Sequence, residues 1–284
     1  MTTITCPTGL QVDLREMLVR EERILSDRAL ARDNRTMETL LSVCTVGCVD
    51  PGPYEFPGDA VDWGRVLQGD RFYALMQLRI ITFGPTFTFQ HVCTQRNCRE
   101  RFDWEFSLTE LAVRKLSKEG LDLFRAGNRF ESAPLPRCGK RVWFRLLTGF
   151  DERKIPLIQK NAKERAASAL LAFRTLEVEG IDPKDTRAKR AFFEDLSMGD
   201  ADFLTDEFDR ADCGVETSID VECPECFAEQ TVDIPFGPTF FMPGRKRTER
   251  RKASRAKADL RLVEPETTEE EPETTGTEEA IDEA

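Results

Sequence analysis

The chain is poor in the residue types and motifs on which most catalytic mechanisms depend. Its 284 residues include a single histidine, His91. It contains no phosphate-binding loop, no GxGxxG dinucleotide fingerprint and no GxSxG nucleophile elbow. Carboxylate pairs such as Asp206 and Glu207 occur, but 33% of the residues are charged, so such pairs are expected on solvated helix faces. We therefore expect no catalytic residue, no cofactor-binding residue, no small-molecule substrate and no enzymatic activity.

Long apolar runs are absent as well. No stretch approaches the roughly 18–20 apolar residues that a membrane-spanning helix needs. The N-terminal MTTITCPTGL lacks the basic start and the apolar run of a signal peptide. Nine is also an odd number of cysteines for a disulfide framework. We expect neither a membrane contact nor disulfide bonds.

Basic charge is scarce outside one short segment. The formal net charge is −11. Residues 245–261 hold nine basic and two acidic residues, whereas residues 264–284 hold ten acidic residues and no basic ones. Residues 1–244 therefore carry a net charge of −8. A mildly acidic body argues against a nucleic-acid-binding surface, which is normally basic, so nucleic acid is not an expected partner.

From Gly244 onward the chain has almost nothing apolar to bury. Such a segment cannot offset the entropy lost on ordering, so we predict that residues 244–284 form a disordered tail, basic and then acidic. The basic stretch GRKRTERRKASRAK could contact an acidic partner or nucleic acid. Its other interpretation is a solvated linker that leads to a solubilising tail. Residues 1–243 are predicted to form a single body.

Two short cysteine pairs lie at the predicted tips of two β-hairpins. CTQRNC follows TFTFQHV and precedes RFDWEF, and CPEC follows TSIDVE and precedes QTVDIPF. Alternation of apolar and polar residues on both sides of a tight turn is typical of a hairpin. We predict hairpins at 83–107 and 214–241.

The cysteine pairs have a spacing suited to a structural zinc site. Two residues between ligands, as in CPEC, let both sulfurs reach one ion, and the four residues of CTQRNC are at the loose end of the usual range. Four thiolates leave no position open for substrate or water. The sequence therefore predicts one zinc ribbon that joins distant parts of the chain, with a structural zinc ion held by Cys93, Cys98, Cys223 and Cys226. The alternative is two unrelated hairpins with free thiols.

The histidine and the remaining cysteines have plainer interpretations. His91 is either a partly buried strand histidine or an alternative zinc ligand. Cys44 and Cys48 end an apolar helical pattern, although two cysteines at this spacing could bind a second metal. We expect the cysteines outside the ribbon to be small buried apolar residues: Cys6, Cys44, Cys48, Cys138 and Cys213.

The rest of the body is predicted to be helical, over 13–82 and 108–212. Apolar residues at helical spacing predict helices in these segments: 14–25, 37–44, 62–81, 108–116 and 151–178. Asp182 followed by Pro183 predicts the start of another helix, and one more ends near Gly214. KRVWFRLLTG alternates and is predicted to be a strand. The expected fold class is α+β: a mostly helical body, β-hairpins that form a zinc-ribbon-like four-cysteine site, and a disordered C-terminal tail.

The order of several segments is specific. LQGDRFYALMQLRIITFGPTFTF leads into the first cysteine pair, CGKRVWFRLLTGFDER and IDPKDTRAKRAFFEDLSMGDADFLTDEFD follow, and the CPEC hairpin closes in IPFGPTFFMP. Over about residues 14–243 this order resembles the baseplate hub and baseplate assembly family of T-even-type contractile-tailed bacteriophages. The chain departs from the family pattern in two ways. Four residues, not two, separate the first cysteines, and neither pair has a glycine directly after its second cysteine.

The resemblance implies a non-enzymatic structural or assembly protein of a contractile tail baseplate, either a hub component or an assembly factor. Its implied partners are other phage baseplate or tail proteins. Its implied location is the host cytoplasm during assembly and, if it is retained, the tail baseplate of the virion. The alternative function is a zinc-ribbon adaptor that binds nucleic acid or an acidic partner through its basic tail.

Overall fold

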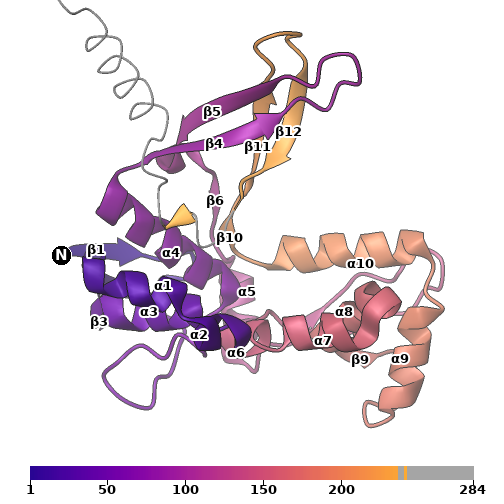
Figure 1. The fold of residues 1–284 in the computed structure, drawn as a ribbon. Helices are drawn as coiled ribbons and strands as arrows, with labels where there is room; N and C mark the ends of the chain where they lie inside the picture. Colours follow the sequence, from indigo (N-terminus) through magenta and orange to yellow (C-terminus); the bar gives the residue numbers. More distant parts are fainter. Residues whose placement is uncertain (236–239, 242–284) are drawn as a thin grey trace, which may run out of the picture. The chain divides into compact units, whose positions relative to one another are not determined.

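The structure is a computed structural model that describes residues 1–235 and 240–241. These residues belong to one compact unit, Met1–Phe241. Helices and small antiparallel sheets alternate along it, in agreement with the predicted α+β class (Figure 1). The predicted tail at 244–284 lies outside the described residues, as do residues 236–239 of the second predicted hairpin.

The elements are named as in Figure 1. The helices are α1 Glu22–Ser26, α2 Arg28–Arg32, α3 Thr36–Cys44, α4 Gln68–Phe83, α5 Lys118–Arg125, α6 Gly149–Glu152, α7 Ile155–Ala162, α8 Ala166–Arg174, α9 Thr186–Glu194 and α10 Met198–Ala211, with 3-10 turns η1 Val19–Glu21, η2 Leu108–Glu110 and η3 Lys163–Arg165. The strands are β1 Thr2–Thr5, β2 Gln11–Leu14, β3 Thr45–Asp50, β4 Thr86–Val92, β5 Arg101–Ser107, β6 Val113–Arg114, β7 Phe130–Glu131, β8 Val142–Phe144, β9 Thr175–Val178, β10 Gly214–Val215, β11 Ser218–Glu222 and β12 Glu229–Asp233. None of these helices is both long and apolar enough to cross a bilayer.

The N-terminal segment forms a sheet that was not predicted. β1, β2 and β3 pair antiparallel in that order. Along β2, buried Val12 and Leu14 alternate with half-buried residues, which is the period of a strand. The prediction of helix from 13 onward is therefore wrong at its start, because Leu14 belongs to β2. The helix predicted at 37–44 is confirmed as α3, and β3 follows it directly.

The helix predicted at 62–81 is present as α4 but begins later. Asp62 closes a turn instead, because its carboxylate accepts a hydrogen bond from the Gly64 backbone N–H at 3.0 Å. α4 lies close to the backbone that leads into β10. A Cβ atom on Gly69 would lie 2.0 Å from the carbonyl oxygen of Cys213, so this contact admits only glycine.

Short strands interrupt the segment predicted as helical over 108–212. The helix predicted at 108–116 is wrong, since η2 makes a single turn there and β6 follows it. The next helix, α5, starts after Ser117, whose hydroxyl oxygen accepts from the Gly120 N–H at 3.0 Å. The N-cap Ser117 therefore starts α5 at the point where the apolar pattern had predicted that a helix would end.

The long helix predicted at 151–178 is divided into α6, α7 and α8. Lys163 has a φ of 50°, which interrupts the helix after α7. The last four residues form β9, which pairs with β8 and buries Thr175 and Val178. β-Branched residues favour such a sheet position over a helix.

The other predictions for residues 108–214 are confirmed, except for the residue that caps α9. The strand predicted in KRVWFRLLTG is confirmed as β8, and α10 ends shortly before Gly214 as expected. α9 is present, but its cap is Asp185, whose carboxylate accepts from the N–H groups of Arg187 and Ala188. Asp182 forms a turn three residues earlier, since its carboxylate accepts from the Lys184 N–H.

Both predicted hairpins are present. β4 pairs with β5, and β11 with β12, over their whole lengths. At the base of the first hairpin, the Phe87 ring packs against Phe106 and Phe240, with centroids 6.0 and 5.0 Å away. The base of this hairpin is thus part of the core, while its tip extends away from it.

A buried carboxylate lies at the centre of the core. Asp70, in the first turn of α4, is fully buried. It accepts hydrogen bonds from the backbone N–H of Thr8 at 3.0 Å, from the Thr8 hydroxyl, and from the Tyr54 hydroxyl at 2.8 Å. Burial raises the pKa of Asp70 to about 6, although the hydrogen bonds from Thr8 and Tyr54 oppose this shift. Asp70 connects the N-terminal sheet, α4 and the loop that follows β3.

Candidate metal centre

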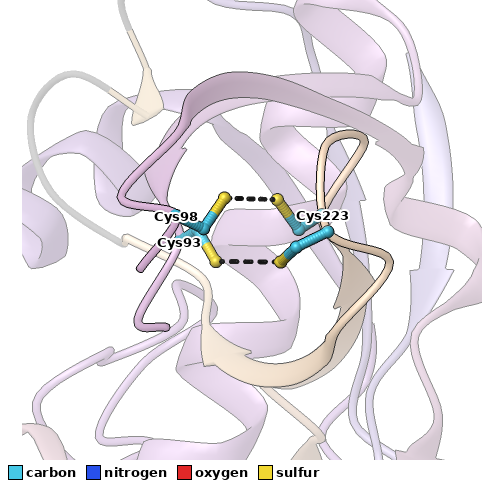
Figure 2. Close-up of side chains that lie close together, drawn as sticks. Cys93, Cys98 and Cys223 are labelled. Atoms are coloured by element: carbon cyan, nitrogen blue, oxygen red, sulfur yellow. Dashed lines mark hydrogen bonds between the residues drawn. The ribbon is translucent and has the colours of Figure 1, made fainter. Parts of the chain in front are cut away.

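Each predicted cysteine pair lies at the tip of its hairpin. Cys93 and Cys98 belong to the loop between β4 and β5, and Cys223 and Cys226 to the loop between β11 and β12. The structure brings the two loops together so that thiols 125 positions apart in the chain lie in contact (Figure 2). All four are free thiols.

The spacing of the sulfur atoms matches a tetrahedral metal site. The Sγ atoms of Cys93 and Cys226 lie 3.7 Å apart, as do those of Cys98 and Cys223. All four Sγ atoms lie within 4.8 Å of one another. Four sulfurs at about 2.3 Å from one zinc ion would be about 3.8 Å apart. Both short contacts join one hairpin to the other, so an ion at this position would link them.

The two loops turn in the same way around their second cysteine. Arg99 and Phe227, which follow these cysteines, each have a φ of 55°. The left-handed turn directs the next backbone N–H, that of Glu100 or Ala228, onto the sulfur of the second cysteine. Glycine adopts this conformation most readily, but the turn forms here without it. The missing glycines therefore do not prevent the four-sulfur arrangement.

Additional residues before the turn accommodate the longer first loop. The Arg99 N–H donates to the Gln95 carbonyl at 3.2 Å, as the Phe227 N–H donates to the Cys223 carbonyl at 2.9 Å. Gln95 therefore occupies the backbone position that Cys223 has in the second loop. Cys93 joins the cluster from the end of β4, and the four-residue spacing is compatible with one shared site.

A glutamine that was not predicted connects the two hairpins. Gln230, on β12, is only 8% exposed. Its Nε2 donates to the Cys93 Sγ at 3.3 Å, and its Oε1 accepts from the Thr94 backbone N–H at 2.8 Å. Residues beyond the ligands often orient a metal site in this way. The available signal was a polar residue on the inward face of an alternating strand.

The four thiols do not ionise equally. Burial disfavours the thiolate of Cys223, but the backbone N–H groups of Cys226 and Glu225 and the neighbouring cysteine side chains lower its pKa to about 7. At Cys98 the Glu100 N–H favours the thiolate, but burial and hydrogen bonds with the other cysteines raise the pKa to about 12. A bound divalent cation would stabilise all four thiolates together, and its binding would release protons.

The alternative ligands do not join this cluster. The Nε2 atom of His91 is 3.2 Å from the Gln230 Oε1, and the ring is half-buried, as expected of a strand histidine. Within the described ranges, no other group of three or more His, Cys, Asp or Glu side chains is close enough to hold an ion. Cys44 and Cys48 therefore belong to no second group of this kind.

The cysteines outside the cluster follow the prediction only in part. Cys6, Cys44 and Cys213 are buried, as predicted. Cys138 is exposed and Cys48 is only half-buried, so the prediction was wrong for these two. Cys138 lies in the turn before β8, where its backbone N–H and its thiol both donate to Asp200.

The chemistry available to the cluster is that of a closed site. Four thiolates complete the tetrahedral coordination of zinc, so no position remains for a substrate or an activated water. The soft sulfur donors also favour zinc or iron over magnesium or calcium. A metal here would hold the two hairpins together and would carry out no reaction.

Comparison with known protein families agrees with the order of segments. The family model described as T4 bacteriophage base plate protein matches residues 1–242, most of the chain. The chain belongs to the T4 bacteriophage base plate protein family. This confirms the resemblance seen over about residues 14–243. Searches of curated proteins and of solved structures find no significant match.

Membership of the family fixes the general role of the chain. It is a structural or assembly protein of a T4-type baseplate. Its interactions are therefore with other baseplate or tail proteins of the phage.

Proposed function

We propose that this T4-type baseplate protein is a non-enzymatic hub component or hub assembly factor whose two hairpins are joined by a structural zinc ion. The ligands are Cys93, Cys98, Cys223 and Cys226. The family match over residues 1–242 carries the assembly role. The two 3.7 Å contacts between sulfurs of different hairpins support the metal.

A non-catalytic role agrees with the way two buried charged groups of the core are used. Asp70 accepts from Thr8 and Tyr54, and the buried Arg79 donates to the carbonyl oxygens of Gly84 and Thr86. Both groups are buried and hydrogen-bonded to internal partners, as expected of groups that hold elements of the core together. The cysteine cluster, in turn, offers no open coordination position.

The assembly role is tested by deleting the gene from the phage. We expect no infectious particles, while heads and free tail components accumulate in the host cytoplasm. Complementation with wild-type protein should restore plating. A Cys223→Ser, Cys226→Ser double variant should not, whereas Cys138→Ser, which changes an exposed cysteine outside the cluster, should restore it. Normal tails in the deletion mutant would contradict the assembly role.

The choice between hub component and assembly factor is made by quantitative mass spectrometry of purified virions. A hub component stays in the virion in a fixed ratio to other baseplate proteins. An assembly factor is present in infected cells and absent from the virion. Either result leaves the assembly role intact and assigns the location.

The second candidate function is a zinc-ribbon adaptor that binds nucleic acid or an acidic partner through the basic segment at 245–257. Its motive is the eight basic residues of that segment. Binding driven by phosphate contacts would fall steeply with salt concentration and with removal of residues 244–284. Recovery of baseplate proteins that is insensitive to nuclease and to removal of these residues would exclude this function.

A further inference from the structure

Phe227 has an unusual combination of exposure and backbone conformation. Its side chain is 72% exposed, more than any other aromatic side chain among the described residues. It also has a φ of 55°, a left-handed conformation that is unfavourable for a bulky residue. Backbone strain costs stability, and an exposed aromatic ring contributes little burial to offset it. Strained residues of this kind cluster at functional sites.

The cysteine cluster needs the conformation of Phe227 but not its ring. The left-handed turn directs the Ala228 N–H onto the neighbouring sulfur, and a glycine would do the same with less strain. Arg99, at the matching position of the first loop, has the same φ and is also exposed. The folding of the loops therefore does not explain why a large apolar side chain is present at position 227.

The two loops around Phe227 carry charges of opposite sign. The first loop carries Arg96 and Arg99, both exposed, and the second carries Glu225 and Glu229, also exposed. No ion pair recorded for the described residues involves any of these four side chains. A shallow hollow between the loops is lined by residues 94–98 together with Cys226 and Ala228, the two neighbours of Phe227.

We propose that the paired loop tips form a docking surface for another protein of the phage tail, which receives the Phe227 ring in an apolar pocket. The partner presents carboxylates to Arg96 and Arg99 and basic side chains to Glu225 and Glu229. A nucleic-acid strand fits less well, because both glutamates beside the ring repel phosphates. Aromatic anchors with a polar rim are typical of the centre of a protein interface. The inference rests on the assembly role and identifies the surface that performs it.

The test uses the deletion phage complemented with Phe227→Ala and Phe227→Gly. We expect both variants to lower the efficiency of plating by about tenfold or more, as loss of an interface anchor would. Phe227→Trp, which keeps a large aromatic ring, should plate within about threefold of wild type. Val19→Ala, which shortens another highly exposed apolar side chain (87% exposed), should plate as wild type.

Stability measurements on the purified variants separate docking from folding. Phe227→Gly should keep its metal content and a Tm within about 2–4 °C of wild type, because glycine suits the left-handed turn. Normal plating by both the alanine and glycine variants would overturn the proposal. So would a glycine variant whose plating falls together with its metal content and Tm, since the ring would then be structural. In both cases the assembly role stands, as the deletion and the cysteine double variant test it separately.

The class of partner is tested by placing the photo-crosslinker p-benzoylphenylalanine at position 227 during infection. An adduct with an identified tail protein that also disappears when Arg96→Glu is added supports the proposal. An adduct that nuclease treatment removes would overturn it in favour of nucleic acid.

Discussion

The hairpin tips and the core around α4 are held together in different ways. In the core, side chains such as Leu40 and Leu78 are fully buried, and Asp70 is satisfied by neighbouring donors. In the first hairpin only one face of the sheet is buried: along β4, Phe87 and Phe89, each 8% exposed, alternate with the exposed Thr88 and Gln90. A two-stranded hairpin with so little burial is marginal alone. We propose that a metal held by the four sulfurs supplies at the tips the stabilisation that apolar contacts supply in the core.

Cys223→Ser should cause the largest loss of stability, and this loss should be limited to the two hairpins. Loss of one thiolate ligand removes the metal, and the free energy of metal binding contributes to folding. We expect hydrogen-exchange protection in β4, β5, β11 and β12 to fall by a factor that corresponds to about 4 kcal/mol. Protection in α4 should persist. Equal losses of protection in the hairpins and in α4 would contradict the idea that only the hairpins depend on the metal.

Leu40→Ala should show the opposite pattern. Leu40 is fully buried in α3, and truncation of such a leucine costs about 2–5 kcal/mol because it removes apolar burial and leaves a cavity. The loss of unfolding free energy, measured by denaturant titration, should be the same with and without a zinc chelator. A loss that depended on chelation would show that the core and the metal site are one cooperative system.

Gln230→Leu should have a smaller effect, on metal affinity. The substitution keeps the size of the side chain but removes the donor to Cys93 and the acceptor for Thr94. We expect zinc to bind about 10–100-fold more weakly, by competition with a chromophoric chelator. Gln95→Leu, in the first loop, is a suitable control because Gln95 acts through its backbone carbonyl. Unchanged affinity in Gln230→Leu would show that the hydrogen bond to Cys93 does not orient the site.

The smallest expected effect is the pH dependence of the stability of the core, which Asp70→Asn should remove. The folded-state pKa of Asp70 is raised to about 6, above its unfolded value of about 3.9. The native state therefore binds the proton more tightly, so this contribution to stability is present at low pH and is lost as pH rises toward 6.

The measurement is the unfolding free energy of wild type minus that of Asp70→Asn at two pH values. We expect the difference to be about 1–1.5 kcal/mol larger at pH 5 than at pH 8. A difference that does not change with pH would show that the Asp70 carboxyl does not titrate in this range.

The sequence revealed the features that depend on local pattern. Both hairpins were predictable because alternation and turn chemistry lie within about 25 residues. The cysteines that meet could be proposed because thiolate spacing has a narrow chemical meaning. The family could be recognised from the order of its segments, and its model then matched residues 1–242. The predicted tail at 244–284 stays a prediction.

Features that depend on distant pairing were missed. The end of the helix predicted at 151–178 is β9, because it pairs with β8. The spacing of apolar residues within a segment gives no information about a strand partner about thirty residues away. Leu14 was placed in a helix for the same reason, since β1 and β3 on either side of β2 decide its conformation. Gln230 was overlooked because its role exists only once the two hairpins meet.

The proposed metal link between the hairpins is tested most directly by elemental analysis and X-ray absorption on protein purified without chelators. One zinc ion per chain is expected, with four sulfur neighbours at about 2.3 Å. Cys223→Ser should lose the ion, whereas Cys138→Ser should keep it. A wild-type protein that is free of metal yet retains protected hairpins would contradict the metal link. So would a zinc ion bound by fewer than four sulfurs.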